Sequence, residues 1–190
     1  MSGVCIVLNG ASSSGKTSIA LAIRERWKGP LQISGIDTFL MCQSEQFFGD
    51  GSPAPGFAWF PTTVDAVPAF DIVAGPLGRG LEQAAQRYWR ACADAGLDQV
   101  VDDVWLRAEQ ALSFKSVMAG ADVLWVGVRC PIEVIEQRER DRGDRRVGQA
   151  RGHAHLVHQW TDYDVEVDTS LLSPAECAST ILGSLVRRDA

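Results

Sequence analysis

The residues with the most evident chemical use form a candidate phosphate-binding loop near the start of the chain. Residues 10–17 read GASSSGKT and match the pattern G-x-x-x-x-G-K-[ST], between an apolar run and an amphipathic stretch. In such a loop, backbone N–H groups and a helix N-terminus bind phosphate oxygens, the lysine reaches the β and γ phosphates, and the threonine hydroxyl ligates Mg²⁺. We therefore predict a nucleoside triphosphate site, with a glycine-rich turn and an exposed lysine as the alternative. The residues assigned to this site are Gly10, Ala11, Ser12, Ser13, Ser14, Gly15, Lys16, Thr17 and Ser18.

Asp37 is the candidate general base. It follows the apolar run 31–36, at the carboxyl edge of a strand that we expect to neighbour the first strand, where ligands of open α/β sheets bind. A carboxylate near the γ-phosphate could accept the proton of a substrate hydroxyl as that hydroxyl attacks. The alternative is that Asp37 caps the N-terminus of a following helix.

Asp102 and Asp103 end another apolar run, at 99–103, and resemble the acidic element that holds Mg²⁺ in phosphate-loop proteins. Neighbouring side chains on a strand point to opposite faces, so at most one of the two acids can serve the metal directly. The pattern does not choose between them, and we take Asp103 together with Thr17 as the predicted metal ligands. A helix cap for the stretch that begins at Trp105 is the alternative.

An arginine-rich segment, 138–151, has a charge opposite to that of the whole chain. Its arginines are Arg138, Arg140, Arg142, Arg145, Arg146 and Arg151, against three acids. Guanidinium groups suit triphosphate oxygens, and Gly143 and Gly148 would let the segment close as a lid. We predict that Arg138, Arg142 and Arg145 bind nucleotide, and that Arg142 acts in catalysis with Lys16. A solvated helix with i, i+4 ion pairs is the alternative.

The elements that must position these residues alternate along the chain. Apolar runs at 4–9, 31–36, 99–102, 123–128 and 165–167 are typical of strands that are buried on both faces of a parallel sheet. Helical patterns follow Gly15, cover 77–95, begin at Pro131, and run from a Ser173-to-Glu176 capping box to about Arg187. This alternation predicts an α/β domain with a central parallel sheet of about five strands flanked by helices.

Residues 38–76 do not fit this alternation. They contain five prolines, a Gly49-Asp50-Gly51 turn and several aromatic side chains. A long irregular loop in a compact domain is usually functional or disordered, and the aromatic content argues against disorder. We predict an irregular insertion that forms an acceptor pocket or a lid; a short extra helix and a loop that cover the core are the alternative.

Composition limits the class of protein and its partners. The 190 residues are 46% hydrophobic and 22% charged, as in one ordinary globular domain spanning 1–190. The net charge of −6 disfavours nucleic acids and anionic membrane surfaces as partners. The five cysteines are widely spaced, without a C-x-x-C pair, and neither a signal peptide nor a long apolar run is visible. We therefore expect a soluble cytoplasmic protein.

Taken together, the chain resembles the chloramphenicol phosphotransferases, which are phosphate-loop small-molecule kinases. The segments that carry the resemblance are 7–17, 35–37, 102–104, 122–130, 142–145 and 163–168. The resemblance implies a three-layer P-loop kinase fold and transfer of the γ-phosphoryl group of ATP, with Mg²⁺, to the primary hydroxyl of chloramphenicol, an antibiotic that would thereby be inactivated. It also implies that Asp37 is the base and that the arginine-rich segment is the lid. Residues 39–70, where an acceptor pocket would form, match the family least, so a related alcohol stays open.

Two other functions are compatible with a phosphate loop. The first is a metabolite kinase that acts on a sugar acid, a shikimate-like acid or a nucleoside. An anionic acceptor would need arginines near Asp37, and residues 38–79 contain none before Arg79. This favours an apolar acceptor that binds to aromatic side chains. A GTP-dependent switch protein would need an N-K-x-D-type segment that reads guanine, and the sequence contains none. An ATP-dependent kinase of a small hydroxyl compound is therefore the preferred function.

Overall fold

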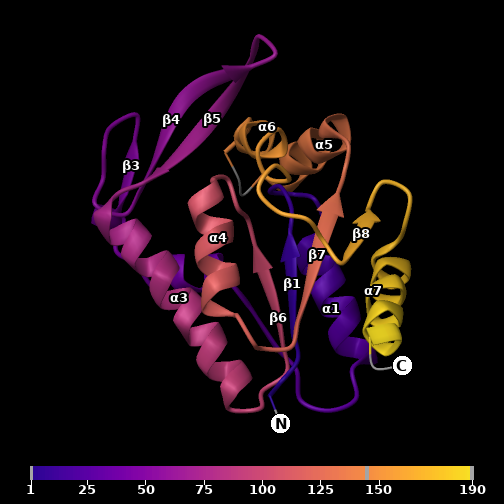
Figure 1. Ribbon diagram of the computed structural model, residues 1–190. Coiled ribbons are helices and arrows are strands. Elements are labelled where there is room, and N and C mark those ends of the chain that lie inside the picture. Colours follow the sequence, from indigo (N-terminus) through magenta and orange to yellow (C-terminus); the bar gives the residue numbers. More distant parts are fainter. Residues whose placement is uncertain (1, 144–145, 189–190) are drawn as a thin grey trace.

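The computed structural model of the protein describes residues 2–143 and 146–188. Its centre is a sheet of five parallel strands. These are β1 (Cys5–Asn9), β2 (Gln32–Gly35), β6 (Gln99–Asp103), β7 (Val123–Arg129) and β8 (Val165–Asp168). Each predicted strand is present, with ends within one residue of those expected. Figure 1 shows helices on both sides of the sheet, which confirms the three-layer α/β fold.

The strand order differs from the expectation in one place. The order is β2-β6-β1-β7-β8, so the strand that precedes Asp37 is separated from the first strand by β6. Val100 and Val101 of β6 are fully buried, whereas Gln32 and Ile33 of β2 are only partly buried. An apolar strand gains more from a place inside the sheet than a mixed strand does, which leaves β2 at the edge.

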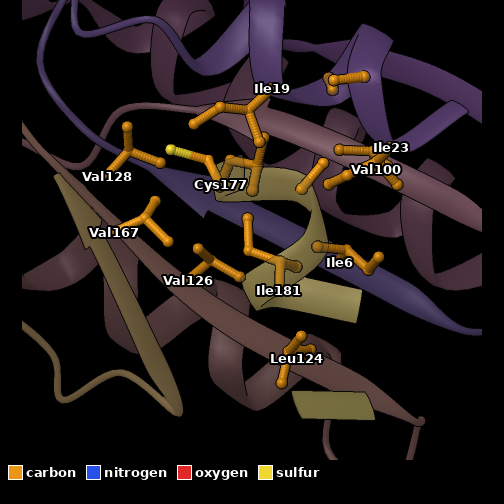
Figure 2. Packing of buried hydrophobic residues seen from close by; sticks show 14 residues of the cluster. Ile6, Ile19, Ile23, Val100, Leu124, Val126, Val128, Val167, Cys177 and Ile181 are labelled. Carbon is orange, nitrogen blue, oxygen red and sulfur yellow. The ribbon is translucent and has the colours of Figure 1, made fainter. Parts of the chain in front are cut away.

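One face of the sheet is covered by α1 (Lys16–Arg26) and α7 (Pro174–Arg188). Figure 2 shows Ile19 and Ile23 of α1 in one apolar cluster with Ile181 of α7 and the side chains of the strands. All three isoleucines are fully buried, and burial of such a side chain stabilises the fold by about 1.5–3 kcal/mol. This packing holds α1, and with it the phosphate loop, against β1.

The other face is covered by α3 (Pro76–Asp94) and α4 (Ala108–Val117); α4 begins three residues beyond Trp105, where the alternative for Asp102 and Asp103 placed the start of a helix. Trp89 of α3, Phe114 of α4 and Trp105 form a second apolar cluster. The ring of Phe114 is 5.1 Å from that of Trp89 and 5.8 Å from that of Trp105, measured between centroids. No helix within the described ranges has the length and apolar character needed to cross a membrane.

The insertion is more regular than we expected. After α2 (Ile36–Leu40) and a short 3-10 helix (Glu45–Phe47), it forms β3 (Phe48–Asp50), β4 (Phe57–Val64) and β5 (Val67–Ala74) in a sheet of its own. In Figure 1 the β4–β5 hairpin projects beyond the main sheet. The prediction of an irregular segment was therefore wrong. Prolines argue against strands, but Pro61 and Pro68 lie in strands that each have an unpaired edge at that point, where a missing N–H is tolerated.

The arginine-rich segment forms α5 (Ile132–Arg142) and α6 (Gln149–Ala154), and α6 lies against the hairpin. The N–H of Phe70 in β5 donates to the Gly148 carbonyl at 3.2 Å. A methyl group at Gly152 would lie 1.9 Å from the Phe70 carbonyl oxygen, so only glycine permits this approach. The predicted lid and the predicted insertion are therefore in direct contact.

Candidate active site

The phosphate loop joins β1 to α1 through two residues in the left-handed region. Ser13 has φ 61° and Gly15 has φ 96°, a backbone form that turns successive N–H groups to one side as a cradle for anions. The Lys16 ammonium lies within this loop and donates to the carbonyls of Gly10 (2.9 Å) and Ala11 (3.0 Å). Among the described residues, the buried hydroxyls of Ser13 and Ser14 have no hydrogen-bond partner. Such groups fit an oxygen-rich ligand in the loop.

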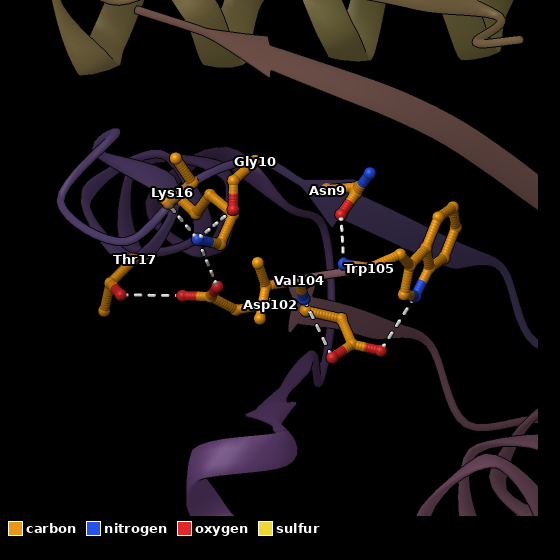
Figure 3. Close-up of polar contacts among 9 residues, drawn as sticks. Asn9, Gly10, Lys16, Thr17, Asp102, Val104 and Trp105 are labelled. Carbon is orange, nitrogen blue, oxygen red and sulfur yellow. Dashed lines mark hydrogen bonds and ion pairs between the residues drawn. The ribbon is translucent and has the colours of Figure 1, made fainter. Parts of the chain in front are cut away.

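The structure distinguishes the two adjacent acids (Figure 3). The Thr17 hydroxyl donates to Asp102 at 2.7 Å, and Lys16 Nζ lies 3.5 Å from the same carboxylate. Asp103 points elsewhere: it accepts from the Val104 N–H at 2.9 Å and from Trp105 Nε1 at 3.1 Å. The acid beside Thr17 is therefore Asp102, whereas we had expected Asp103 there. The proposed helix cap is also absent, because α4 begins only at Ala108.

Asp103 is nearly sealed from solvent, with 8% of its surface exposed. Burial raises the pKa of its carboxyl to about 7; the bonds from Val104 and Trp105 act against this rise, and the charges of Glu82 and Asp102 add to it. Its partner Trp105 is fixed in turn by Asn9, whose side-chain oxygen accepts the Trp105 N–H at 2.9 Å. Asn9 was not among the predicted site residues; the signal that could have found it is a polar residue at the end of an otherwise apolar strand.

A cavity of about 540 Å³ begins at the phosphate loop and is lined by residues of α5 and of the loop after β8. Arg138 lines it and is held by Thr169, donating to its hydroxyl at 2.9 Å and to its carbonyl at 2.8 Å. The Thr169 hydroxyl donates at 2.7 Å to the carbonyl of Ser14 in the loop. Arg142 lines the same cavity. Two of the three arginines predicted to bind nucleotide therefore lie where phosphates would be.

The remaining arginines of the segment have other partners or no described position. Arg146 pairs with Asp50 of β3 through two contacts of 2.6 and 3.0 Å, which lower the pKa of that carboxyl. Arg151 bonds to Glu136, and Arg140 bonds to Gln137. Arg145 lies outside the described residues. The described arginines thus fall into three groups: two line the cavity at the phosphate loop, Arg146 holds the hairpin, and Arg140 and Arg151 bond to residues of α5.

A second cavity, of about 440 Å³, lies under the hairpin, between β4, β5, α3 and the segment after β6. Its apolar wall includes Phe57, Trp59, Ile72 and Trp89. The predicted insertion thus contributes aromatic side chains, Phe57 and Trp59 among them, to the wall of a pocket. The two cavities share Ile36, Asp37, Asp103, Val104, Gln149 and His153 in their linings, so they meet at these residues.

Asp37 lies at this junction of the two cavities, in the first turn of α2. The N-cap of α2 is Gly35, whose N–H donates to the Thr38 hydroxyl at 3.2 Å. The alternative in which Asp37 is the cap is therefore wrong. Its exposed carboxylate borders both cavities, a position from which it can reach a group that passes between them.

Charged side chains also line the second cavity, and several of them are paired. Burial raises the pKa of Glu82, which accepts from Gln110 at 2.6 Å, while the charges of Arg79 and Arg107 lower it. Arg107 bonds to Asp71 at 3.2 Å and Arg79 donates to the Ala74 carbonyl. Both arginines are occupied by groups of the protein, so the cavity has less capacity for an anionic ligand than two unpaired arginines would give it.

Comparison with known proteins agrees with this arrangement. A Mycobacterium tuberculosis protein named "Putative O-phosphotransferase Rv2636" is 33% identical over 178 residues, which cover 93% of this chain and 79% of that protein. The structure of the Mycobacterium tuberculosis APS kinase CysC in complex with AMPPNP and APS has a TM-score of 0.67 at 17% identity, covering 97% of this chain and 98% of that one. A sugar kinase from a Janibacter species has a TM-score of 0.63 at 18% identity, covering 97% and 95%.

At these identities the two solved structures establish the fold alone, which is that of the P-loop kinases. The family comparison covers almost the whole chain, because residues 3–186 match the family described as chloramphenicol phosphotransferase-like protein. The matched range contains the phosphate loop, Asp37 and the predicted lid segment. The chain therefore belongs to the chloramphenicol phosphotransferase-like family and is a P-loop O-phosphotransferase.

Proposed function

We propose that the protein transfers the γ-phosphoryl group of ATP to a hydroxyl of chloramphenicol or of a similar neutral, partly apolar alcohol. The observation that carries this proposal is the position of Asp37, at the point where the phosphate-loop cavity meets a cavity with an aromatic wall. Phosphorylation of that hydroxyl would inactivate the antibiotic. The insertion 38–76 then forms the acceptor pocket and 138–151 the lid of a single domain.

The nucleotide side is supported by the fit of the residues present. The loop offers inward N–H groups, two buried hydroxyls without a protein partner, and the Lys16 ammonium. Arg138 and Arg142 add positive charge farther along the same cavity. The structural neighbour APS kinase is in complex with AMPPNP, which supports ATP as the nucleotide.

A Mg²⁺ ion would be held by Thr17 and Asp102, whose oxygens lie 2.7 Å apart at the loop. Hydroxyl and carboxylate oxygens are the ligands that Mg²⁺ prefers. When bound, the ion neutralises charge on the β and γ phosphates. Asp103 is less suited to this role, because its two oxygens already accept from the Val104 N–H and from Trp105 Nε1.

The transfer itself needs little covalent chemistry from the protein. The acceptor oxygen bonds to the γ-phosphorus, the bond from that phosphorus to the β–γ bridging oxygen breaks, and ADP leaves with the bond's electron pair. The hydroxyl proton goes to Asp37, a role worth about 10²–10⁴-fold in rate. Lys16 and Arg142 stabilise negative charge on the phosphoryl oxygens. The use of ATP, together with the five free cysteines in the structure, favours the cytoplasm as the site of activity.

The test is incubation of the purified protein with MgATP and chloramphenicol, followed by mass spectrometry of the product. We expect a product that is heavier by one phosphoryl group. Asp37→Asn should bind ATP normally and lose transfer, whereas Lys16→Ala should lose ATP binding itself. ATP binding without consumption, across chloramphenicol and a panel of other small alcohols, would refute the enzymatic proposal and favour a nucleotide-binding switch protein.

A further inference from the structure

Gln149 is a buried polar residue at the junction of the two cavities to which no role has yet been assigned. It is the first residue of α6, only 8% of its surface is exposed, and it lines both the phosphate cavity and the acceptor cavity. Buried amide groups are normally satisfied at both of their ends. The positions of the amide oxygen and the amide nitrogen therefore show what Gln149 can bind.

One end of the Gln149 amide is fixed by the hairpin. Trp59 Nε1 donates to Gln149 Oε1 at 3.1 Å. Because an indole nitrogen is only a donor, the atom that faces it must be the oxygen, and the amide nitrogen must point the other way. Among the described residues, Gln149 Nε2 has no hydrogen-bond acceptor. This nitrogen is also not one of the fully buried polar atoms, so part of its surface is exposed. Its two N–H groups are therefore available at the junction.

Trp59 is itself held in place, so the direction of the amide is built into the fold. Its ring lies 5.9 Å from that of Phe48, and the Arg146 guanidinium lies 5.9 Å from its centroid. Arg146 is anchored in turn on Asp50. The indole, the amide and the hairpin thus form one connected group, which reaches from the acceptor cavity to the lid.

We propose that Gln149 is an acceptor-binding residue that donates an N–H to a neutral oxygen of the substrate, such as a carbonyl, ether or second hydroxyl, close to the hydroxyl that is phosphorylated. Trp59 is the positioning residue that aims this N–H. The inference rests on the proposed function, because it requires a phosphoryl acceptor in the second cavity. A neutral oxygen is favoured over a carboxylate because the exposed Asp37 carboxylate borders the same junction and would repel an anion.

The test is steady-state kinetics with MgATP and chloramphenicol for wild type, Gln149→Met, Gln149→Glu and Trp59→Phe. Methionine keeps the length of the side chain without its donors, and glutamate keeps the oxygen for Trp59 but removes the NH₂ group. Loss of one hydrogen bond is worth about a factor of ten. We expect Gln149→Met to raise KM for chloramphenicol about tenfold, with a smaller change in kcat and an unchanged KM for ATP, and Gln149→Glu to be at least as impaired.

Trp59→Phe should give a KM for chloramphenicol similar to that of Gln149→Met, and the two changes together should be no worse than either alone. A purely structural role would instead give additive effects and would also change KM for ATP. Analogues of chloramphenicol that each lack one oxygen identify the contact, because one of them should be phosphorylated equally well by wild type and Gln149→Met. Thermal unfolding checks that each variant is folded.

The outcomes separate the two proposals. Wild-type turnover with an unchanged KM for chloramphenicol in both Gln149 variants would overturn the role of Gln149 and leave the proposed function standing. No turnover of any alcohol by the wild type would overturn the proposed function, and this inference with it. A fall in kcat for every acceptor, with KM unchanged, would place Gln149 on the transferred phosphoryl group and would also overturn the inference.

Discussion

The contact between α6 and the hairpin can be perturbed by a single methyl group. In Gly152→Ala the added carbon would lie 1.9 Å from the Phe70 carbonyl oxygen, and ordinary contact begins at 3.4 Å. Helix and strand must therefore separate by about 1.5 Å. Because Gln149 lies one turn earlier on α6, this movement would carry it away from the junction of the cavities and from Trp59.

The magnitude follows from two opposing effects. Replacing glycine by alanine inside a helix stabilises it by roughly 0.5–1 kcal/mol, whereas forcing an extra methyl into a packed contact costs about 1–3 kcal/mol. Gly183 in α7 has no atom within 4 Å of the added methyl, so Gly183→Ala isolates the first effect. For a domain of this size, 1 kcal/mol moves Tm by about 2–4 °C. We expect Gly152→Ala to melt several degrees below Gly183→Ala.

Activity should respond more strongly than stability, because a misplacement of about 1 Å can lower a rate by about 10²-fold. Thermal unfolding followed by circular dichroism gives Tm, and phosphorylation of chloramphenicol with MgATP gives kcat/KM. We expect Gly183→Ala to be as active as wild type and Gly152→Ala to lose about 10²-fold in kcat/KM for the acceptor. Equal stability and equal activity of the two variants would refute the tight approach of α6 to β5.

Three further predictions follow from the site. The pKa of Asp103 is about 7 in the folded protein and 3.8 in the unfolded chain, so the folded state binds more protons between these two values. The free energy of unfolding should therefore fall by up to about 4 kcal/mol as pH rises from 4 to 7. Urea unfolding without Mg²⁺ should show this loss in wild type and not in Asp103→Asn, and parallel pH curves would contradict it. Asp102→Asn should raise the Mg²⁺ concentration needed for half-maximal rate about tenfold or more, and Asp103→Asn should change it much less; the opposite order would contradict the assignment of the metal ligand. Arg138→Gln should weaken ATP binding in calorimetry about tenfold, whereas Arg146→Gln should leave it near wild type, and equal losses would show that both arginines reach phosphate.

The parts of the fold that local pattern determines were predictable. A strand that is buried on both faces can be recognised in the sequence as an apolar run of about five residues. The ends of the strands at residues 5–9 and 123–129 were therefore predicted to within one residue. The last helix was also found from its capping box: the Ser173 hydroxyl and N–H both bond to Glu176. In each case the decisive interactions lie within a few residues along the chain.

The parts that depend on distant contacts were not predictable. The strand order depends on which of β6 and β2 is more deeply buried, and the residue pattern within either strand does not predict this difference. The division of the arginines depends on Asp50, which lies 96 residues from Arg146. The hairpin was missed because its prolines argue against strands unless the unpaired edges are known. Gln149 was missed because a glutamine next to arginines has no pattern of its own.

Which of Asp102 and Asp103 lies beside Thr17 can be decided once the face of β6 that packs against α1 is known. Side chains alternate along β6, so Asp102 shares a face with Val100, and Asp103 shares a face with Val101. Val100 belongs to the apolar cluster under α1, the helix that carries Thr17, whereas Val101 belongs to the cluster under α3 and α4. The two adjacent carboxylates therefore have different surroundings because they lie on opposite faces of the sheet. It follows that the packing of α1 on the Val100 face assigns Asp102 to Thr17, and that alternation alone could not have done so.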